Sequence, residues 1–281
     1  MSAERAVQAH LTSPHPHAER AAALLPHMIA AAARAADLIA SRAGDRANLE
    51  WRVKSHADFV SDVDTAAERA IRETLARLVP GSKVMGEELS PESVPGEGTH
   101  FIVDPLDGTT NFLHGYPEYA VSIALVIDGV LSAGVVQNAV TGECFSASIG
   151  NGAEHNGARI SVSRNADPAR ALIGTGFPFR SFTHVKRYLR QFEAVSRATS
   201  GIRRAGSAAL DLCDVACGRF DAFWELELSP WDFSAGVLIT REAGGIVTTI
   251  DGGDVPYTPS SIVAGSAAMH PWLLTVLREA A

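Results

Sequence analysis

The chain has 281 residues, 46% of them hydrophobic and 20% charged, which is enough to bury a large core in one domain or in two closely packed halves. A formal net charge of -8 argues against a nucleic-acid partner, because proteins that bind nucleic acid gather Lys and Arg on one surface. The unfavourable charge for nucleic acid leaves a small molecule as the expected partner. Three irregularly spaced cysteines are too few for a disulfide framework and lack the partners of a zinc site, so we expect them to be reduced.

Residues 1–20 predict a mobile leader, because charges, prolines and histidines are mixed there without the apolar core of a signal peptide. The apolar run that follows, residues 21–40, is interrupted by Pro26, Arg34 and Asp37, so we expect it to stay out of a membrane. Both features favour a cytoplasmic protein with no membrane partner.

Two helices are predicted in the first third of the chain. An alanine-rich run predicts the first over residues 26–42, ended near Gly44 by a residue that tolerates the left-handed conformation. Apolar residues at helical spacing predict the second over residues 65–78, where Thr65 and Glu68 have the order of a capping box.

The middle of the chain is rich in short β-branched runs, which predict strands over residues 101–103, 121–127 and 130–136. Asp128-Gly129 predicts a tight hairpin turn between the last two. In the C-terminal half, helical and strand patterns alternate: helices over 207–216 and 232–243, and strands over 220–224 and 246–250. Helices layered on sheets are expected, with a cleft where the halves meet.

Two carboxylates, Asp104 and Asp107, follow directly after a predicted apolar strand. Pro105 cannot continue a hydrogen-bonded ladder, so we expect a turn that brings them together and exposes the Leu106 carbonyl. Carboxylates held this closely repel each other unless one is protonated or a cation lies between them, and oxygen ligands favour Mg²⁺. Taken alone, however, Asp107-Gly108 is better explained as a simple turn and Asp104 as a cap at the end of a strand.

Two further acids lie where predicted elements meet. Glu87 follows the run of residues 83–85, and Asp232 precedes a predicted helix. Taken singly, Asp232 is better explained as a helix N-cap than as a metal ligand. The order of all four acids along the chain is more informative than any one of them.

These segments resemble the motifs of the inositol monophosphatase family, within the wider group that includes fructose-1,6-bisphosphatases. The likeness covers nearly the whole chain after the leader and rests on Gly-Glu-Glu at 86–88, Asp-Pro-Leu-Asp-Gly-Thr at 104–109, Gly-Ser-Ala-Ala-Leu-Asp at 206–211 and Trp-Asp-Phe-Ser-Ala-Gly at 231–236. The resemblance implies an α+β fold, a layered α-β-α-β-α sandwich. A single phosphatase unit would cover residues 21–281, with a sheet-rich half to about residue 160 and an α/β half beyond it.

The resemblance also implies a Mg²⁺-dependent phosphatase. Roughly two or three ions would be held by Glu87, Asp104, the Leu106 carbonyl, Asp107, the Thr109 hydroxyl and Asp232. Glu87 and the pair of Thr109 and Asp64 would activate a water molecule, with no covalent intermediate. Lys54 matches the family's metal-facing lysine, although a lone lysine is usually solvated, and Asp64 is also explained as a helix cap.

Substrate contacts implied by the resemblance lie at Asp107, Gly108, Thr109, Gly206, Ser207, Ala208, Glu225 and Asp232. Glu225 would accept hydrogen bonds from the hydroxyls of an inositol ring, so inositol 1-phosphate is the expected substrate. Histidinol phosphate is the alternative, because Glu225 would equally neutralise an amine. Histidinol phosphatases often carry Lys at the position of Thr110, which favours the inositol ester.

Two other interpretations are open. Haloacid-dehalogenase-like phosphatases have one residue between their two aspartates, whereas Asp104 and Asp107 are separated by two. A regulatory protein that keeps this fold without its chemistry belongs to another class, but every matched metal ligand is present here. The resemblance further implies a homodimer and inhibition by Li⁺.

Overall fold

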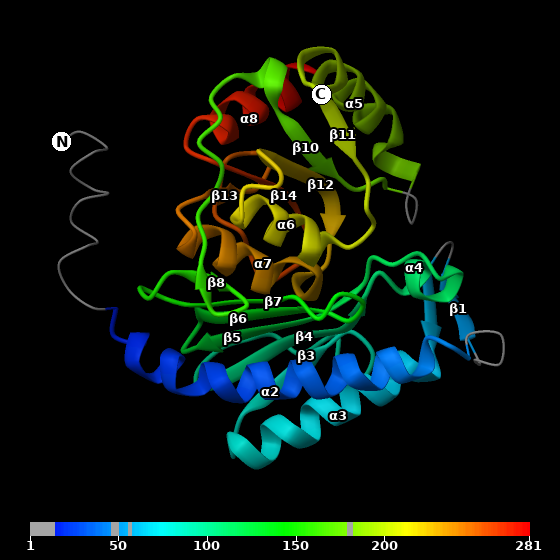
Figure 1. The fold of residues 1–281 in the computed structure, drawn as a ribbon, viewed down its shortest axis with the longest axis vertical. Helices are drawn as coiled ribbons and strands as arrows, with labels where there is room; N and C mark the ends of the chain where they lie inside the picture. Colours follow the sequence, from blue (N-terminus) through cyan, green and yellow to red (C-terminus); the bar gives the residue numbers. More distant parts are fainter. Residues whose placement is uncertain (1–14, 46–50, 56–57, 179–181) are drawn as a thin grey trace.

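The computed structural model describes residues 15–45, 51–55, 58–178 and 182–281. Within them, three pairs of helices alternate with a seven-stranded and a five-stranded sheet, stacked as five layers (Figure 1). This arrangement confirms the expected α-β-α-β-α sandwich. Most of the expected leader, residues 1–14, lies outside the described residues.

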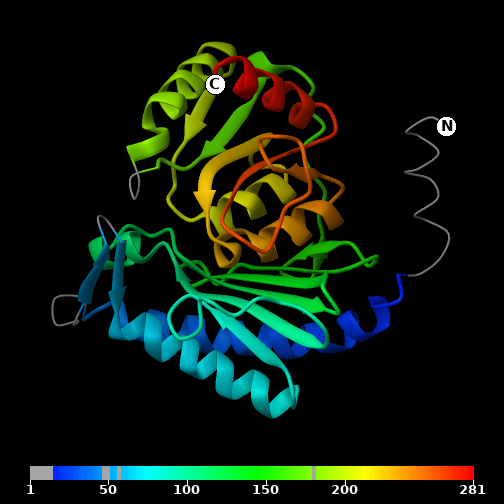
Figure 2. The same ribbon diagram turned by 180° about the vertical axis from the view of Figure 1, so that it is seen from behind.

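The first outer layer consists of α2 (Ala18–Arg42) and α3 (Asp62–Leu78), which cover one face of the seven-stranded sheet (Figure 2). The sheet keeps the order of its strands in the sequence: β3 (Lys83–Gly86), β4 (Thr99–Asp107), β5 (Ala120–Ile127), β6 (Val130–Asn138), β7 (Cys144–Ser148), β8 (Ala153–His155) and β9 (Ala158–Arg159). Only the β3–β4 pair is parallel among its described strands.

The central layer consists of α6 (Ala208–Ala216) and α7 (Pro230–Glu242), which lie between the two sheets. The five-stranded sheet has the spatial order β11 (Gly201–Arg203), β10 (Leu172–Thr175), β12 (Ala222–Leu228), β14 (Ser260–Gly265) and β13 (Ile246–Thr248). The last layer is α5 (Val185–Ala198) and α8 (Met269–Glu279). Smaller elements are β1 (Trp51–Ser55), β2 (Asp58–Ser61), α4 (Thr109–His114), and the 3-10 turns η2 (Pro168–Arg170) and η3 (Phe182–His184).

Helix α2 begins at Ala18, earlier than the expected residue 26, and Pro26 lies inside it. Contrary to our expectation, α2 is long and apolar enough to cross a membrane when only its length and composition are considered. In this fold its apolar face, which includes Met28 and Ile39, packs against β5, β6 and β7. A helix with one face against a sheet needs the same apolar content, so composition did not distinguish the two situations.

Helix α3 begins at Asp62, three residues before the expected start, so the prediction of a Thr65–Glu68 capping box is wrong. The box is formed instead by Ser61 and Asp64: the Ser61 hydroxyl accepts from Val63 N–H at 3.2 Å, and Ser61 N–H donates to Asp64 Oδ2 at 2.9 Å. Glu68 is fully buried and bonded elsewhere. One turn of helix is therefore gained upstream of the expected boundary.

Strand β4 continues past Pro105 to Asp107, so the expected turn is a bulge. Asp104 pairs with Ser122 and Asp107 pairs with Ala120, which places two residues of β4 opposite one of β5. A bulge accommodates proline because it interrupts the ladder where the missing N–H would be needed. The predicted Asp128-Gly129 turn is confirmed, with φ of 50° and 79°.

The C-terminal elements are displaced by a few residues from their expected bounds. Strand β12 covers Ala222–Leu228 rather than 220–224, because a bulge with Glu227 at φ 60° lets its pairing with β14 resume at Leu228. Helix α7 starts at Pro230, which suits the first turn because that position needs no N–H donor. Strand β13 ends at Thr248, two residues before the expected end.

Gly134 of β6 marks a close approach of α7 to the sheet, since a Cβ atom added there would lie 2.7 Å from the Ala235 carbonyl oxygen. We predict that Gly134→Ala lowers the free energy of unfolding by about 1–3 kcal/mol, because α7 is confined between two sheets. Urea denaturation would measure the loss. Gly96→Ala, where an added Cβ meets nothing within 4 Å, is the matched control, and equal stability of both variants would contradict this tight packing.

Candidate active site

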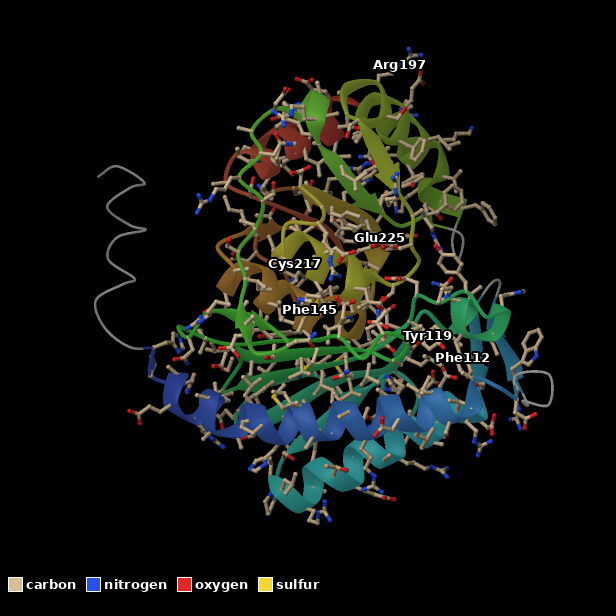
Figure 3. The ribbon with its side chains drawn as sticks, in the orientation of Figure 1. Phe112, Tyr119, Phe145, Arg197, Cys217 and Glu225 are labelled. Atoms are coloured by element: carbon tan, nitrogen blue, oxygen red, sulfur yellow. The ribbon has the colours of Figure 1, made fainter. Side chains whose placement is uncertain are left out.

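A cavity of about 460 Å³ opens between the two halves of the sandwich, beside the ends of β4 and β12 and the first turns of α6 and α7. Figure 3 labels Glu225 on the side of the five-stranded sheet. Phe112 and Tyr119 pack edge to face on the side of the seven-stranded sheet, with ring centroids 5.4 Å apart. The expected cleft between the halves is therefore present.

The wall of this cavity is strongly acidic. Arg204 contributes a guanidinium group, and the carboxylates are those of Glu87, Asp104, Asp107, Asp211, Glu225, Glu227 and Asp232. Without added cations, so many negative charges would repel a phosphate ester.

Three of these carboxylates form a compact cluster. One oxygen from each of Asp104, Asp107 and Asp232 lies within 4.8 Å of the others. The pKa of Asp104 is raised well above its ordinary value, first because the group is buried and then because Glu87, Asp107 and Asp232 are nearby. An all-oxygen set of this kind fits a hard divalent cation such as Mg²⁺.

Asp107 also connects the two halves of the chain. Its Oδ2 accepts a hydrogen bond of 2.6 Å from the Ser207 hydroxyl and one of 2.8 Å from Ala209 N–H at the start of α6. Ser207 is fully buried and is the N-cap of α6, so it acts on Asp107 rather than forming part of the cavity wall. The expected substrate residues Gly206 and Ala208 do line the cavity.

Asp64 and Thr109 meet as expected, although 45 positions separate them in the sequence. The Thr109 hydroxyl lies 3.0 Å from Asp64 Oδ1 and 3.0 Å from the Leu106 carbonyl, and its single proton can be donated to only one of them. Burial raises the pKa of Asp64 to about 6, although hydrogen bonds from Ser61 and Thr109 oppose the shift. Thr109 lines the cavity together with Gly108, and Asp64 lies behind it.

Asp232 is the third residue of α7, not its N-cap. Its Oδ2 accepts a 2.7 Å hydrogen bond from Ser229 N–H in a capping-box arrangement. The Ser122 hydroxyl of β5 donates to the Trp231 carbonyl at 3.2 Å, which ties the start of α7 to the seven-stranded sheet. Asp232 is thereby placed beside the carboxylates of β4.

The far side of the cavity is formed by Glu225 and its neighbours. A Cβ atom added to Gly176 would lie 1.8 Å from the Glu225 carboxyl carbon, so a larger residue at position 176 would displace the end of this side chain. Asn111 Nδ2 donates to the Ala205 carbonyl at 2.9 Å and orders the loop before α6. The side chain of the expected Lys54, on β1, lies outside the described residues.

Asp211 and Arg204 also line the cavity, although their sequence context predicted no role for either of them. Asp211 is 2% exposed, and its Oδ1 has no hydrogen-bond partner among the described residues. Burial, followed by the charge of Glu225, raises the pKa of Asp211 well above its ordinary value. A carboxylate in the apolar run of residues 208–213 was the available signal, since a buried acid without a cation is unusual.

The sequence and the fold are similar to those of known proteins. Residues 21–281 match the model of the inositol monophosphatase family. The chain is 44% identical over 259 residues to the inositol-1-monophosphatase of Rhizobium meliloti, which covers 92% of this chain and 97% of the relative. It is also 44% identical over 252 residues to the Nus factor SuhB of Pseudomonas aeruginosa, covering 88% of this chain and 93% of that protein.

The crystal structure of the extragenic suppressor protein suhB from Bartonella henselae has the same fold, with a TM-score of 0.85 and 40% identity over 90% of this chain and 98% of that one. Fold and site together define a five-layered α+β protein whose cavity gathers carboxylates suited to divalent cations. The chain belongs to the inositol monophosphatase family.

The raised pKa of Asp64 predicts how pH affects the stability of metal-free protein. Because this pKa is about 6 in the folded state and 3.8 ordinarily, the stabilising contribution is complete below pH 3.8 and is lost as pH rises through about 6. The shift corresponds to about 3 kcal/mol. We expect Asp64→Asn to remove a large part of this fall in the free energy of unfolding. The measurement is the free energy of unfolding as a function of pH in the presence of chelator. A wild-type pH profile in Asp64→Asn would contradict the prediction.

Proposed function

We propose that the chain is a Mg²⁺-dependent phosphatase that hydrolyses inositol 1-phosphate to inositol and phosphate. The observation that carries the proposal is the cluster of Asp104, Asp107 and Asp232 in a cavity whose described wall holds several other acids and one guanidinium group, that of Arg204. A phosphate ester binds in such a cavity only when cations outweigh the carboxylates. Membership of the inositol monophosphatase family supports the same reaction.

Mg²⁺ would be held by Glu87, Asp104, Asp107 and Asp232, with the Leu106 carbonyl and the Thr109 hydroxyl nearby. When bound, the ions would supply positive charge to the phosphate group and lower the pKa of a water molecule. Phosphate monoesters are among the slowest substrates to hydrolyse in water, so positive charge at the transition state is required.

The proton of the attacking water would pass through Thr109 and Asp64. An ionised Asp64 accepts the hydroxyl proton of Thr109 at 3.0 Å, which leaves the Thr109 oxygen as an acceptor for a water proton. Burial of Asp64 keeps this acceptor away from competing solvent. Glu87, also in the cavity wall, would hold the water from its other side.

Selection of the alcohol would depend on the opposite wall. Glu225 accepts hydrogen bonds from hydroxyl groups, and Gly206 and Ala208 leave room for a ring beside it. The name of the Rhizobium meliloti relative supports inositol 1-phosphate. Histidinol phosphate is the alternative, because an amine would also suit Glu225.

A regulatory role is the competing class of function, since a relative of equal identity is named a Nus factor. The intact cluster of carboxylates and the Thr109–Asp64 hydrogen bond favour catalysis, because a purely structural core gains nothing from such repulsion. We also propose a cytoplasmic homodimer built from one phosphatase unit, inhibited by Li⁺ at the Mg²⁺ site. Phosphate release by the pure protein with and without Mg²⁺ would separate catalysis from regulation.

Asp104→Asn tests the metal site. An amide is a poor ligand for Mg²⁺, so we expect less than about 1% of wild-type kcat, while the removal of one buried charge leaves the metal-free protein at least as stable. Phosphate release and thermal unfolding in chelator would measure the two effects. Asp37→Asn, on the exposed face of α2, is the control. Normal activity of Asp104→Asn, or of wild type in excess chelator, would refute the mechanism.

Glu225→Gln separates substrate recognition from catalysis. The change keeps the size of the side chain but weakens charge-assisted hydrogen bonds worth about 1.5–3 kcal/mol each, so we expect kcat/KM for inositol 1-phosphate to fall roughly ten- to a hundredfold. p-Nitrophenyl phosphate, which has no hydroxyls for Glu225 to bind, should react as before. A parallel fall for both esters would place Glu225 in the catalytic machinery, and no fall for either would exclude the polyol contact.

A further inference from the structure

Helix α3 carries a second buried carboxylate, Glu68, one turn after Asp64. Glu68 is fully buried but is not part of the cavity wall. Its Oε2 accepts hydrogen bonds from Glu88 N–H at 2.8 Å and Leu89 N–H at 3.2 Å, and its Oε1 accepts from Arg72 Nε at 2.8 Å. Glu68 therefore binds the backbone immediately after Glu87.

The backbone immediately before Glu87 is shaped around the same carboxylate. A Cβ atom added to Gly86 would lie 2.1 Å from Glu68 Oε1 and 2.4 Å from its carboxyl carbon. Gly86 does not have a positive φ, so its conformation alone does not require glycine. Glycine is needed here because the chain passes against Glu68.

A further contact of this segment comes from β4. Glu87 N–H donates to the Val103 carbonyl at 3.2 Å, next to Asp104 in the sequence. Glu87 is thus fixed between β4 on one side and Glu68 on the other. Without Glu68, the two N–H groups after Glu87 would lose their shared acceptor, and the loop would be free to shift.

We propose that Glu68 is a positioning residue that holds Glu87 in the cavity wall near Asp104, where its carboxylate would contribute to divalent-cation binding. This inference rests on the proposed function and extends it to a residue outside the cavity. One helix then sets both parts of the water-activating apparatus: Asp64 orients Thr109, and Glu68 orients Glu87. Residues that orient metal ligands typically change metal affinity or activity by about ten- to a hundredfold when substituted.

The test compares Glu68→Gln and Gly86→Ala with Glu73→Gln, an exposed carboxylate on the same helix. Glu68→Gln replaces the charged acceptor by an amide, whereas Gly86→Ala leaves Glu68 intact and displaces it with a methyl group. Mn²⁺ affinity by calorimetry is the main measurement, with the Mg²⁺ concentration at half-maximal phosphate release as a second. Thermal unfolding in chelator reports the effect on the fold alone.

We expect both test variants to bind Mn²⁺ at least about tenfold more weakly than wild type, with Glu73→Gln unchanged. Wild-type Mn²⁺ affinity in both variants, even with a lower melting temperature in chelator, would overturn the positioning role and leave Glu68 as a structural residue. A wild-type protein that binds Mn²⁺ but releases no phosphate would contradict the proposed function instead. The role of Glu68 would still be decided by the Mn²⁺ affinities.

Discussion

Repulsion among the carboxylates of Asp104, Asp107 and Asp232 has to be offset by the elements that carry these residues. One oxygen of each lies within 4.8 Å of the others, and Asp104 is 1% exposed, so little water is available to screen them. Two donors to Asp107 and one to Asp232 offset part of this cost. A cation bound among these carboxylates would relieve their repulsion, and this relief would contribute to its binding free energy.

The three aspartates come from separate segments of the chain, and local backbone features place each of them. The bulge at Pro105 brings Asp104 and Asp107 to one end of β4, and the capping box at Ser229 fixes Asp232 at the start of α7. Ser207 joins the halves, because its hydroxyl binds Asp107 while it caps α6. The bulge and the two helix caps are parts of the backbone framework, and site residues held on such elements are positioned more precisely than residues on loops.

The hairpin at Asp128 was predictable from the strand pattern. The five layers and the convergence of Asp104, Asp107 and Asp232 were predictable from the resemblance of the motifs to the family. The start of α3 was not. Two pairs of residues have the order of a capping box, Ser61 with Asp64 and Thr65 with Glu68. The first pair forms the box, and Glu68 instead accepts a hydrogen bond from Glu88 N–H, twenty residues further along the chain. Asp211 was not predicted as a site residue, because a single sequence does not reveal which side of α6 faces the cavity.

Asp64 and Asp232 each take part in beginning a helix, and each also belongs to the site. Selection for folding alone would therefore retain a hydrogen-bonding side chain at both positions, because the loss of a cap destabilises a helix by about 1 kcal/mol. Glu87 and Asp104 cap no helix, so a descendant released from selection for catalysis would lose them earlier. In evolutionary comparisons, the capping positions 64 and 232 would report on the fold, whereas Glu87 and Asp104 would report on the proposed reaction; this chain has an acid at all four positions.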